Sequence, residues 1–179
     1  MIYGGKDLAA AFRTVRTNTI TIAEDIPAEQ YGFRPTPEMR SVAEQLAHVA
    51  INPMWQIDVH GNRVGHIELE RFQRGLAEAA AREQMLQTKD QIIAALNTEG
   101  EAFATFLESR SDDVLAERVS FPPPVQPSSR TRFEMLLSAK EHEMHHRAQL
   151  MVYQRLLGMV PHLTARRQAR FAAAPTPAN

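Results

Sequence analysis

The chain has 179 residues, which is enough for one well-packed domain and few for two. Its net charge of −1 creates no field that would favour nucleic acid or an anionic membrane, and its composition of 44% hydrophobic and 23% charged residues is typical of a soluble globular protein. The sequence contains no cysteine, so disulfides, thiolate metal sites and a cysteine nucleophile are excluded, and any metal must be bound by His, Asp or Glu.

Helical spacing of apolar residues dominates the chain, and strand signals are nearly absent. A first helix is predicted from about Lys6 to Ile26, and the two prolines of the following YGFRPTPEMRS indicate an extended connector. Ser41 with Glu44 three residues later is a capping box, which predicts the start of a second helix. Pro53 predicts a kink in that helix.

The remaining sequence predicts two more helices. HGNRVGH, residues 60–66, is predicted to be a loop whose histidines occur by chance, and a third long helix fits residues 75–109. SFPPPVQPSSRT contains four prolines and is predicted to be a linker. A fourth helix is predicted from about Thr131 to Gly158.

Four helices with two long connections predict an all-α fold, a single four-helix bundle with long connections. The bundle domain is expected to cover residues 1–165. Residues 166–179 are expected to form a basic helix end and a flexible C-terminal tail.

Three of the seven histidines fall within five positions of the fourth helix, in EHEMHHRAQL at residues 141–150. His142 and His146 are one helical turn apart and share a face, so both imidazoles can bind one metal ion. Apolar residues flank this face on both sides, and we therefore expect it to look into the bundle.

His142, Glu143 and His146 also match HExxH, the motif of zinc proteases. Such a protease needs a third ligand, usually downstream, but no Asp or Glu follows His146. The position of the third metzincin histidine is Val152, and His162 is the only histidine that remains, beyond a glycine and a proline. The sequence therefore disfavours a peptidase.

A third ligand is available upstream, because His48 lies in the middle of the second helix in the apolar stretch LAHVAIN. Side chains of facing helices meet in the core of a bundle, which makes His48 a natural partner of His142 and His146. Two other interpretations stay open at this point. His48 alone fits a hydrogen-bonded core histidine, and the other two fit histidines on the surface or beside a site.

These segments resemble the DinB/YfiT-like family over roughly residues 5–162. The matching pieces are FRPTPEMRSVAEQLAH, which ends in His48, TKDQIIAALNTEGEAF, and EHEMHHRAQLMVYQRLLGM. The family commonly has HHRGQ where this chain has HHRAQ, so Ala148 replaces a glycine. The resemblance implies a four-helix bundle in which His48, His142 and His146 bind one divalent transition metal. Histidine ligands suit zinc or nickel, and iron or manganese also fit.

The resemblance also implies an activity. Some DinB-like proteins are similar to thiol S-transferases, which join a low-molecular-weight thiol to an electrophile, and others to a mycothiol-dependent isomerase. Three neutral imidazoles would leave a divalent ion with its full charge and an open position, which favours a bound thiolate. The leading hypothesis is a metal-dependent thiol transferase. Metal-assisted hydrolysis and a non-catalytic metal-binding protein of the stress response are the alternatives.

Five further residues are candidates for the pocket or its surroundings. Gln149 is predicted to be a pocket donor or a packing residue. Glu143 could act as a general base, although a solvated position is favoured, and His145 could line the pocket, although an exposed position is favoured. Trp55 could wall the pocket, although core packing is favoured, and Tyr153 lies on the face of the histidine pair.

The expected partners are a small-molecule thiol and an electrophile, with no nucleic acid and no membrane. The basic run ARRQAR is best explained as a solvated helix end. A homodimer is expected, because dimerisation is common in the family. No signal peptide and no stretch of ~20 apolar residues is present, so we expect a cytoplasmic protein.

Overall fold

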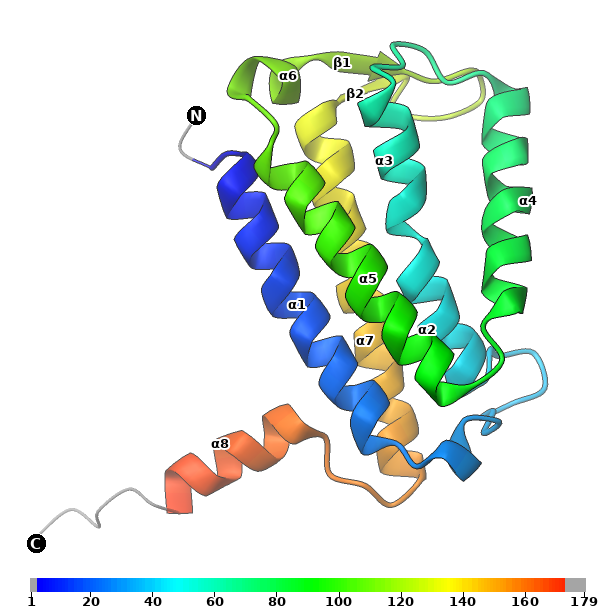
Figure 1. Cartoon of the computed structure of the whole chain (residues 1–179), viewed down its shortest axis with the longest axis vertical. Coiled ribbons are helices and arrows are strands. Elements are labelled where there is room, and N and C mark those ends of the chain that lie inside the picture. Colours follow the sequence, from blue (N-terminus) through cyan, green and yellow to red (C-terminus); the bar gives the residue numbers. More distant parts are fainter. Residues whose placement is uncertain (1–2, 173–179) are drawn as a thin grey trace, which may run out of the picture.

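The computed structural model describes residues 3–172, and most of this chain is helical. Four long helical rods lie side by side and confirm the predicted all-α four-helix bundle (Figure 1). The rods are α1 (Gly5–Asp25), α2 (Val42–Ile51) continued by α3 (Pro53–Gly61), α5 (Lys89–Glu108) and α7 (Arg132–Leu156). No helix in this described range has the length and apolar content needed to cross a membrane.

The predicted start of α2 and the predicted kink are confirmed. The Ser41 hydroxyl accepts a hydrogen bond from the Glu44 amide at 3.2 Å, and the Glu44 carboxylate accepts one from the Ser41 amide at 2.8 Å. These two bonds satisfy amide groups that would otherwise lack partners at a helix start. The helix then breaks at Asn52, and α3 begins at Pro53.

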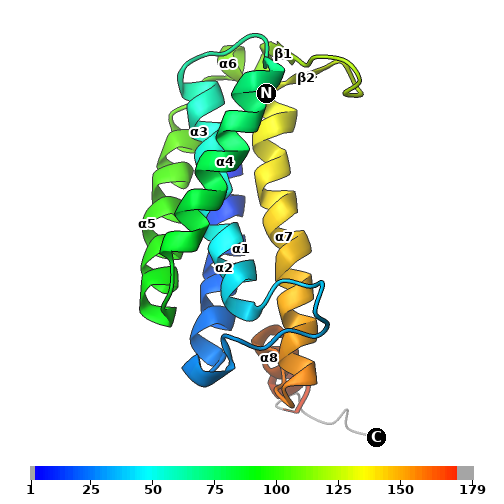
Figure 2. The same cartoon turned by 90° about the vertical axis from the view of Figure 1, so that its right-hand side faces the viewer.

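The single helix predicted over residues 75–109 is wrong, because the chain forms two helices there. Helix α4 (Leu69–Met85) ends before a short connection, and a capping box of Thr88 and Gln91 then starts α5. The Thr88 hydroxyl oxygen accepts a hydrogen bond from the Gln91 backbone amide at 3.2 Å. The chain reverses direction at this cap, so α4 lies against α2 and α3, outside the four-helix core (Figure 2).

The segment predicted to be only a linker contains a strand. Strands β1 (Arg118–Ser120) and β2 (Ser129–Thr131) form an antiparallel pair in which Val119 lies opposite Arg130. Val119 is buried against α3 and α7, and this packing stabilises strands too short to be detected by alternation. The hairpin and the short helix α6 (Asp112–Ala116) cover one end of the bundle (Figure 1).

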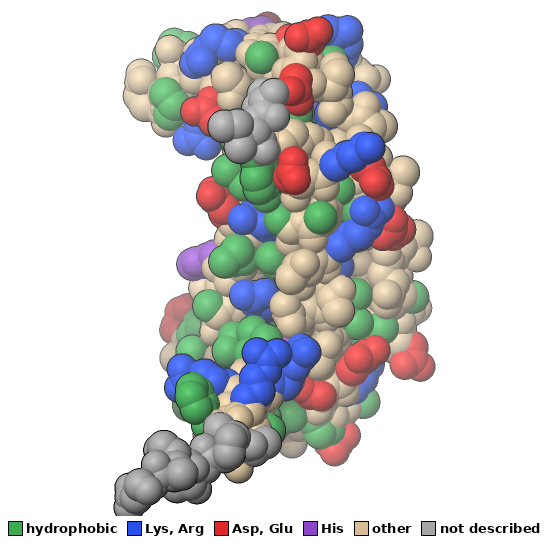
Figure 3. Space-filling model, turned by 90° about the vertical axis from the view of Figure 1, so that its left-hand side faces the viewer, with side chains coloured by type: hydrophobic (Ala, Val, Ile, Leu, Met, Phe, Trp, Pro, Cys, Tyr) green, Lys and Arg blue, Asp and Glu red, His purple; other side chains and the backbone are tan. Residues whose placement is uncertain are grey.

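At the opposite end, α7 stops at Leu156, and Gly158 takes the left-handed conformation, with φ of 78°, that favours glycine after a helix. Helix α8 (His162–Ala172) follows and carries three exposed arginines. Figure 3 shows Lys and Arg side chains gathered at this end of the molecule. Helix α8 continues across residue 165, where a domain boundary was expected, and the tail over 173–179 lies outside the described residues.

The interior of the bundle holds two apolar clusters with a buried ion pair between them. Phe12 and Leu136 belong to one cluster, and Ile22 and Leu150 belong to the other. At the level between them, Arg16 Nε lies 3.0 Å from one carboxylate oxygen of Glu143 and Arg16 Nη2 lies 3.0 Å from the other. Both side chains are at most 5% exposed, so they are paired without competition from water.

The same guanidinium contacts all four rods of the bundle. From α1, Arg16 reaches Glu143 on α7 and donates to the Leu96 carbonyl of α5 at 2.8 Å and to the Val49 carbonyl of α2 at 3.1 Å. The Val49 carbonyl needs this donor, because Pro53 has no N–H to give it the usual helical bond. Gly100 leaves room for the arginine, since a Cβ there would lie 2.9 Å from Arg16 Cγ.

A second buried polar contact involves His60, which the sequence placed in a loop. That expectation is wrong for His60, because α3 continues to Gly61 and buries the imidazole completely. Its Nε2 donates to Gln56 at 3.0 Å, and its Nδ1 accepts from Arg132 at 3.1 Å. Burial, with the nearby positive charges of Arg132 and Arg110, lowers the pKa of His60 to about 4.

Breaking the central ion pair should be costly. We predict that Arg16→Met or Glu143→Leu alone lowers the free energy of unfolding by about 3–5 kcal/mol, because each leaves a buried charge without its partner. The double variant should lose less than the sum of the two singles. Urea denaturation measures all three. Arg13→Met is the matched control, because its partner Glu101 is 60% exposed, and it should cost less than about 1 kcal/mol. Additive single effects would contradict the assigned coupling.

His60 should make stability depend on pH. Its pKa is about 4 in the folded protein and about 6.5 in the unfolded chain, so the unfolded chain binds more protons between these values. The contribution is therefore present above pH 6.5 and is lost as the pH falls toward 4. We predict that His60→Gln reduces the loss of unfolding free energy between pH 7 and pH 5 by about 2 kcal/mol, measured by denaturation in the presence of a chelator. Equal losses in both proteins would show that His60 does not titrate in this way.

Candidate metal centre

The structure brings together three histidines from two helices. His48 from α2 and His142 and His146 from α7 form the one group of His, Asp and Glu side chains, among residues 3–172, that could hold a metal ion. His142 Nε2 lies 3.2 Å from His48 Nε2 and 3.0 Å from His146 Nε2. All three ligand atoms lie within 4.8 Å of one another. The spacing of four residues on α7 and the crossing of α2 against α7 create this convergence.

Neighbouring side chains orient two of the three rings. His48 Nδ1 lies 2.8 Å from the Glu83 carboxylate, and a carboxylate can only accept, so the proton sits on Nδ1 and the Nε2 lone pair faces the cluster. His146 Nδ1 lies 2.9 Å from the Gln149 amide oxygen, an acceptor that would hold the Nδ1 proton and leave Nε2 free for a metal. Gln45 contacts both His146 Nδ1 and Gln149 Oε1. Such partners on the second ring nitrogen are a common feature of metal-binding histidines.

The spacing of the nitrogens fits a tetrahedral metal ion. Bonds of ~2.0–2.1 Å from zinc to three imidazoles place the ligand nitrogens ~3.3 Å apart. The two observed separations of 3.0 and 3.2 Å are close to this value. A set of three imidazoles also leaves a fourth position for another ligand.

Burial favours the neutral form of the α7 imidazoles. It lowers the pKa of His142 to about 4, with further lowering by His146, His48, His145 and Arg40. Burial also lowers the pKa of His146, against the hydrogen bond that its ring donates to the Gln149 amide oxygen. Neutral imidazoles are the form that binds metal, so these two ligands need no deprotonation near pH 7.

One member of the cluster, His48, lines a cavity of about 260 Å³ between α2 and α4. His48 and Glu83 lie at one part of its wall, and Arg40 lies on the connector before α2. The remaining wall is largely apolar and consists of Asn52, Trp55, Phe72, Gly75, Leu76, Ala79 and Ala80. The cluster lies between α2 and α7, with His146 buried and His48 directed toward Glu83 of α4, and Glu143 is buried beside it in the bundle.

Glu143 and Tyr153 lie away from the histidine cluster. The solvated position favoured for Glu143 is wrong, because the side chain is 2% exposed and paired with Arg16. A carboxylate held in this way has no access to a water on the metal, so the HExxH glutamate lacks its protease role. Tyr153 is buried in the apolar core, and its hydroxyl donates to the Arg40 carbonyl at 3.0 Å.

The other candidates lie closer to the cluster. Gln149 contacts His146, as described above, and its amide nitrogen contacts His145 at 3.1 Å. His145 is exposed, which confirms the favoured position. Trp55 is half-buried; it lines the cavity and also packs against an apolar core cluster, as the favoured interpretation expects. Its ring packs against Gly75, where a Cβ would come within 2.4 Å of it.

Sequence reasoning missed Gln45, Glu83 and Arg40. Gln45 could have been found, because it precedes His48 by three residues and so shares its helix face. Glu83 gave no usable signal, since it lies on α4, whose boundaries were predicted incorrectly. Arg40 lies in an irregular connector, where sequence spacing does not determine which side chains meet.

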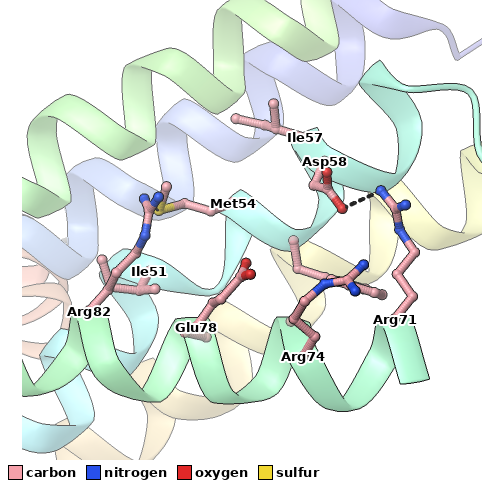
Figure 4. A pocket seen from close by; sticks show the side chains of 11 residues that line it. Ile51, Met54, Ile57, Asp58, Arg71, Arg74, Glu78 and Arg82 are labelled. Atoms are coloured by element: carbon pink, nitrogen blue, oxygen red, sulfur yellow. Dashed lines mark hydrogen bonds and ion pairs between the residues drawn. The ribbon is translucent and has the colours of Figure 1, made fainter. Parts of the chain in front are cut away.

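A second cavity, of about 480 Å³, lies on the other side of the contact between Gly75 and Trp55. Arginines of α4 line it, with Arg71 paired to Asp58 at 2.7 Å (Figure 4). In the same view Arg74 and Glu78 extend from α4 toward the cavity. This cavity contains no histidine.

Comparisons with known proteins agree with this fold. The model of the DinB superfamily matches residues 11–150. The crystal structure of YjoA, a DinB-like protein from Bacillus subtilis, is 22% identical with a TM-score of 0.64, and the match covers 86% of this chain and 92% of that one. An uncharacterized protein from Clostridium difficile 630 is 11% identical with a TM-score of 0.63, covering 85% and 96%. At these identities the likeness concerns the fold alone. No curated protein matches the chain.

The partner of His48 should strengthen metal binding. We predict that Glu83→Ala weakens zinc affinity about 10–100-fold, because the His48 ring loses the acceptor that fixes its orientation. His48→Ala should weaken it further. Competition titration with a chromophoric chelator measures both. Glu78→Ala, on the same helix but at the other cavity, is the matched control and should leave the affinity unchanged. If His48→Ala keeps the wild-type affinity, the three-histidine site is wrong.

Proposed function

The chain belongs to the DinB superfamily, and from that premise we propose that it is a metal-dependent thiol S-transferase. Its reaction would join a low-molecular-weight thiol to an electrophile. The thiol must come from a separate molecule, because the chain has no cysteine. The single observation that carries this proposal is the three-histidine cluster, one member of which, His48, lines a largely apolar cavity.

An open flank supports catalysis over a purely structural metal. Structural zinc sites are closed by four protein ligands, whereas catalytic sites keep a position for water or substrate. Here three imidazoles converge, and His48 is part of a cavity wall that also contains the partly exposed side chains of Phe72 and Leu76. A protein that only stored or sensed a metal would have no use for an apolar space beside it.

A divalent ion bound by the three histidines would supply positive charge that keeps a thiol ionised near neutral pH. The protein residues have separate tasks. Glu83 and Gln149 hold two rings in the ligating orientation. The apolar wall limits water around the reacting groups. In the overall reaction the thiol loses its proton to solvent, its sulfur bonds to the electrophilic carbon, and the leaving group departs with the electrons of the broken bond.

Metal-assisted hydrolysis is less well supported. It needs a carboxylate or imidazole free to take a proton from water. Glu143 is paired with Arg16 in the core, and Glu83, the one acidic residue lining the cavity, accepts the proton of His48. A thiol needs no such base once the positive charge lowers its pKa.

Thiol binding can be observed directly. We predict that the cobalt-substituted protein develops a sulfur-to-metal charge-transfer band when titrated with glutathione or cysteine, because a thiolate enters the open position. The band should be absent in His142→Ala and retained in His66→Ala, whose ring contacts Ser120 far from the cluster. A wild-type cobalt protein that shows no new band with these or other common cellular thiols would remove the main support for the transferase.

A further inference from the structure

We propose that the cavity beside His48 binds a small molecule with one carboxylate and an apolar body, and that Arg40 binds the carboxylate. This inference rests on the proposed function, because it names the substrate class of the same site. It concerns a part of the cavity that the metal does not occupy. The apolar wall and the guanidinium are the two features that recognise the ligand.

Arg40 is a cation without a protein partner. Among the described residues its side chain has no ion pair or hydrogen bond, although it lines a cavity that contains a carboxylate, Glu83. The neighbouring Arg34, on the same connector, is by contrast paired with Glu44 at 2.7 Å. The backbone at Arg40 is held in place, because its carbonyl accepts from Tyr153. The backbone of Arg40 is thus anchored, and its exposed, unpaired side chain lines the cavity.

The apolar wall accounts for the body of the ligand. Phe72 and Leu76 are 44% and 56% exposed, and Trp55 is half-buried beside them. These side chains follow one face of α4, and α4 has no buried residue. A ligand with an apolar body would cover this exposed area when it occupies the cavity.

The charge and the volume of the cavity narrow the class of ligand further. Glu83 is the one acidic residue of the wall and is already bonded to His48, so Arg40 and a bound ion would make the cavity positive. The planar fork of a single guanidinium matches one carboxylate in a bidentate contact. A volume of about 260 Å³ is at the lower limit of small-molecule pockets, which favours a small monoacid over a nucleotide.

The single tryptophan of the chain provides the measurement, because Trp55 lines this cavity. The zinc-loaded protein is titrated with 4-phenylbutyrate and with 4-phenylbutan-1-ol, which share the apolar body but differ in the carboxylate, while Trp55 fluorescence is recorded. We expect Arg40→Gln to raise the Kd of the acid ~10-fold and to leave the Kd of the alcohol unchanged. Arg34→Gln, the matched control on the same connector, should bind both as the wild type does.

Two results would overturn the proposal. Trp55 also borders the second cavity, so a loss of acid binding in Arg74→Gln with wild-type binding in Arg40→Gln would place the carboxylate there. Failure of the wild type to bind the acid more tightly than the alcohol would remove the role of Arg40.

Repeating the titration after chelation separates this inference from the proposed function. The effect of Arg40→Gln should persist without the ion, because the guanidinium contacts the carboxylate directly. If the effect disappears with the ion, the carboxylate is a metal ligand and the assignment to Arg40 is wrong. A cobalt protein that binds no thiol but keeps the Arg40 effect would refute the transferase and retain the carboxylate site.

Discussion

One buried guanidinium holds the bundle together. Arg16 joins α1 to a carboxylate on α7 and to backbone carbonyls of α2 and α5. Two of these contacts depend on local features of the sequence: Pro53 leaves the Val49 carbonyl without its usual donor, and Gly100 leaves space for the arginine. This arrangement fixes the rotation of α7 about its own axis. With Glu143 directed inward, His142 and His146 are turned toward His48 on α2.

The metal cluster and the ion pair therefore belong to one polar level across the bundle. His48 is adjacent in sequence to Val49, whose carbonyl binds Arg16, and Glu143 lies between His142 and His146. Apolar clusters above and below this level isolate it. The residues of the ion pair and its carbonyl contacts are therefore sequence neighbours of the residues that can hold the ion. Because the core residues are rigidly packed, the three imidazoles are held within bonding distance of one point.

Local signals in the sequence predicted much of this structure. The features that the sequence did not predict depend on contacts between residues far apart in the chain. Capping at Ser41, the break at Pro53 and the histidine pair on one face of α7 depend on residues close in the chain, and all could be recognised. The burial of Glu143 could not, because its partner lies 127 residues away. The contact of Glu83 with His48 spans 35 residues and needs α4 to double back. That reversal depended on the capping box at residue 88, which the helical periodicity concealed.

Because α4 lies outside the core, the residues that stabilise the fold are largely different from the residues that shape the cavity. Residues that define the fold lie in the four-helix core, whereas α4 contributes no buried side chain and still supplies much of the cavity wall. Its close approach to Trp55 demands glycine at one position, Gly75, and leaves its neighbours free. Substitutions along this helix can alter the shape of the cavity at little cost in stability. Ligand preference can therefore diverge between related proteins of this design while the core and its histidines stay unchanged.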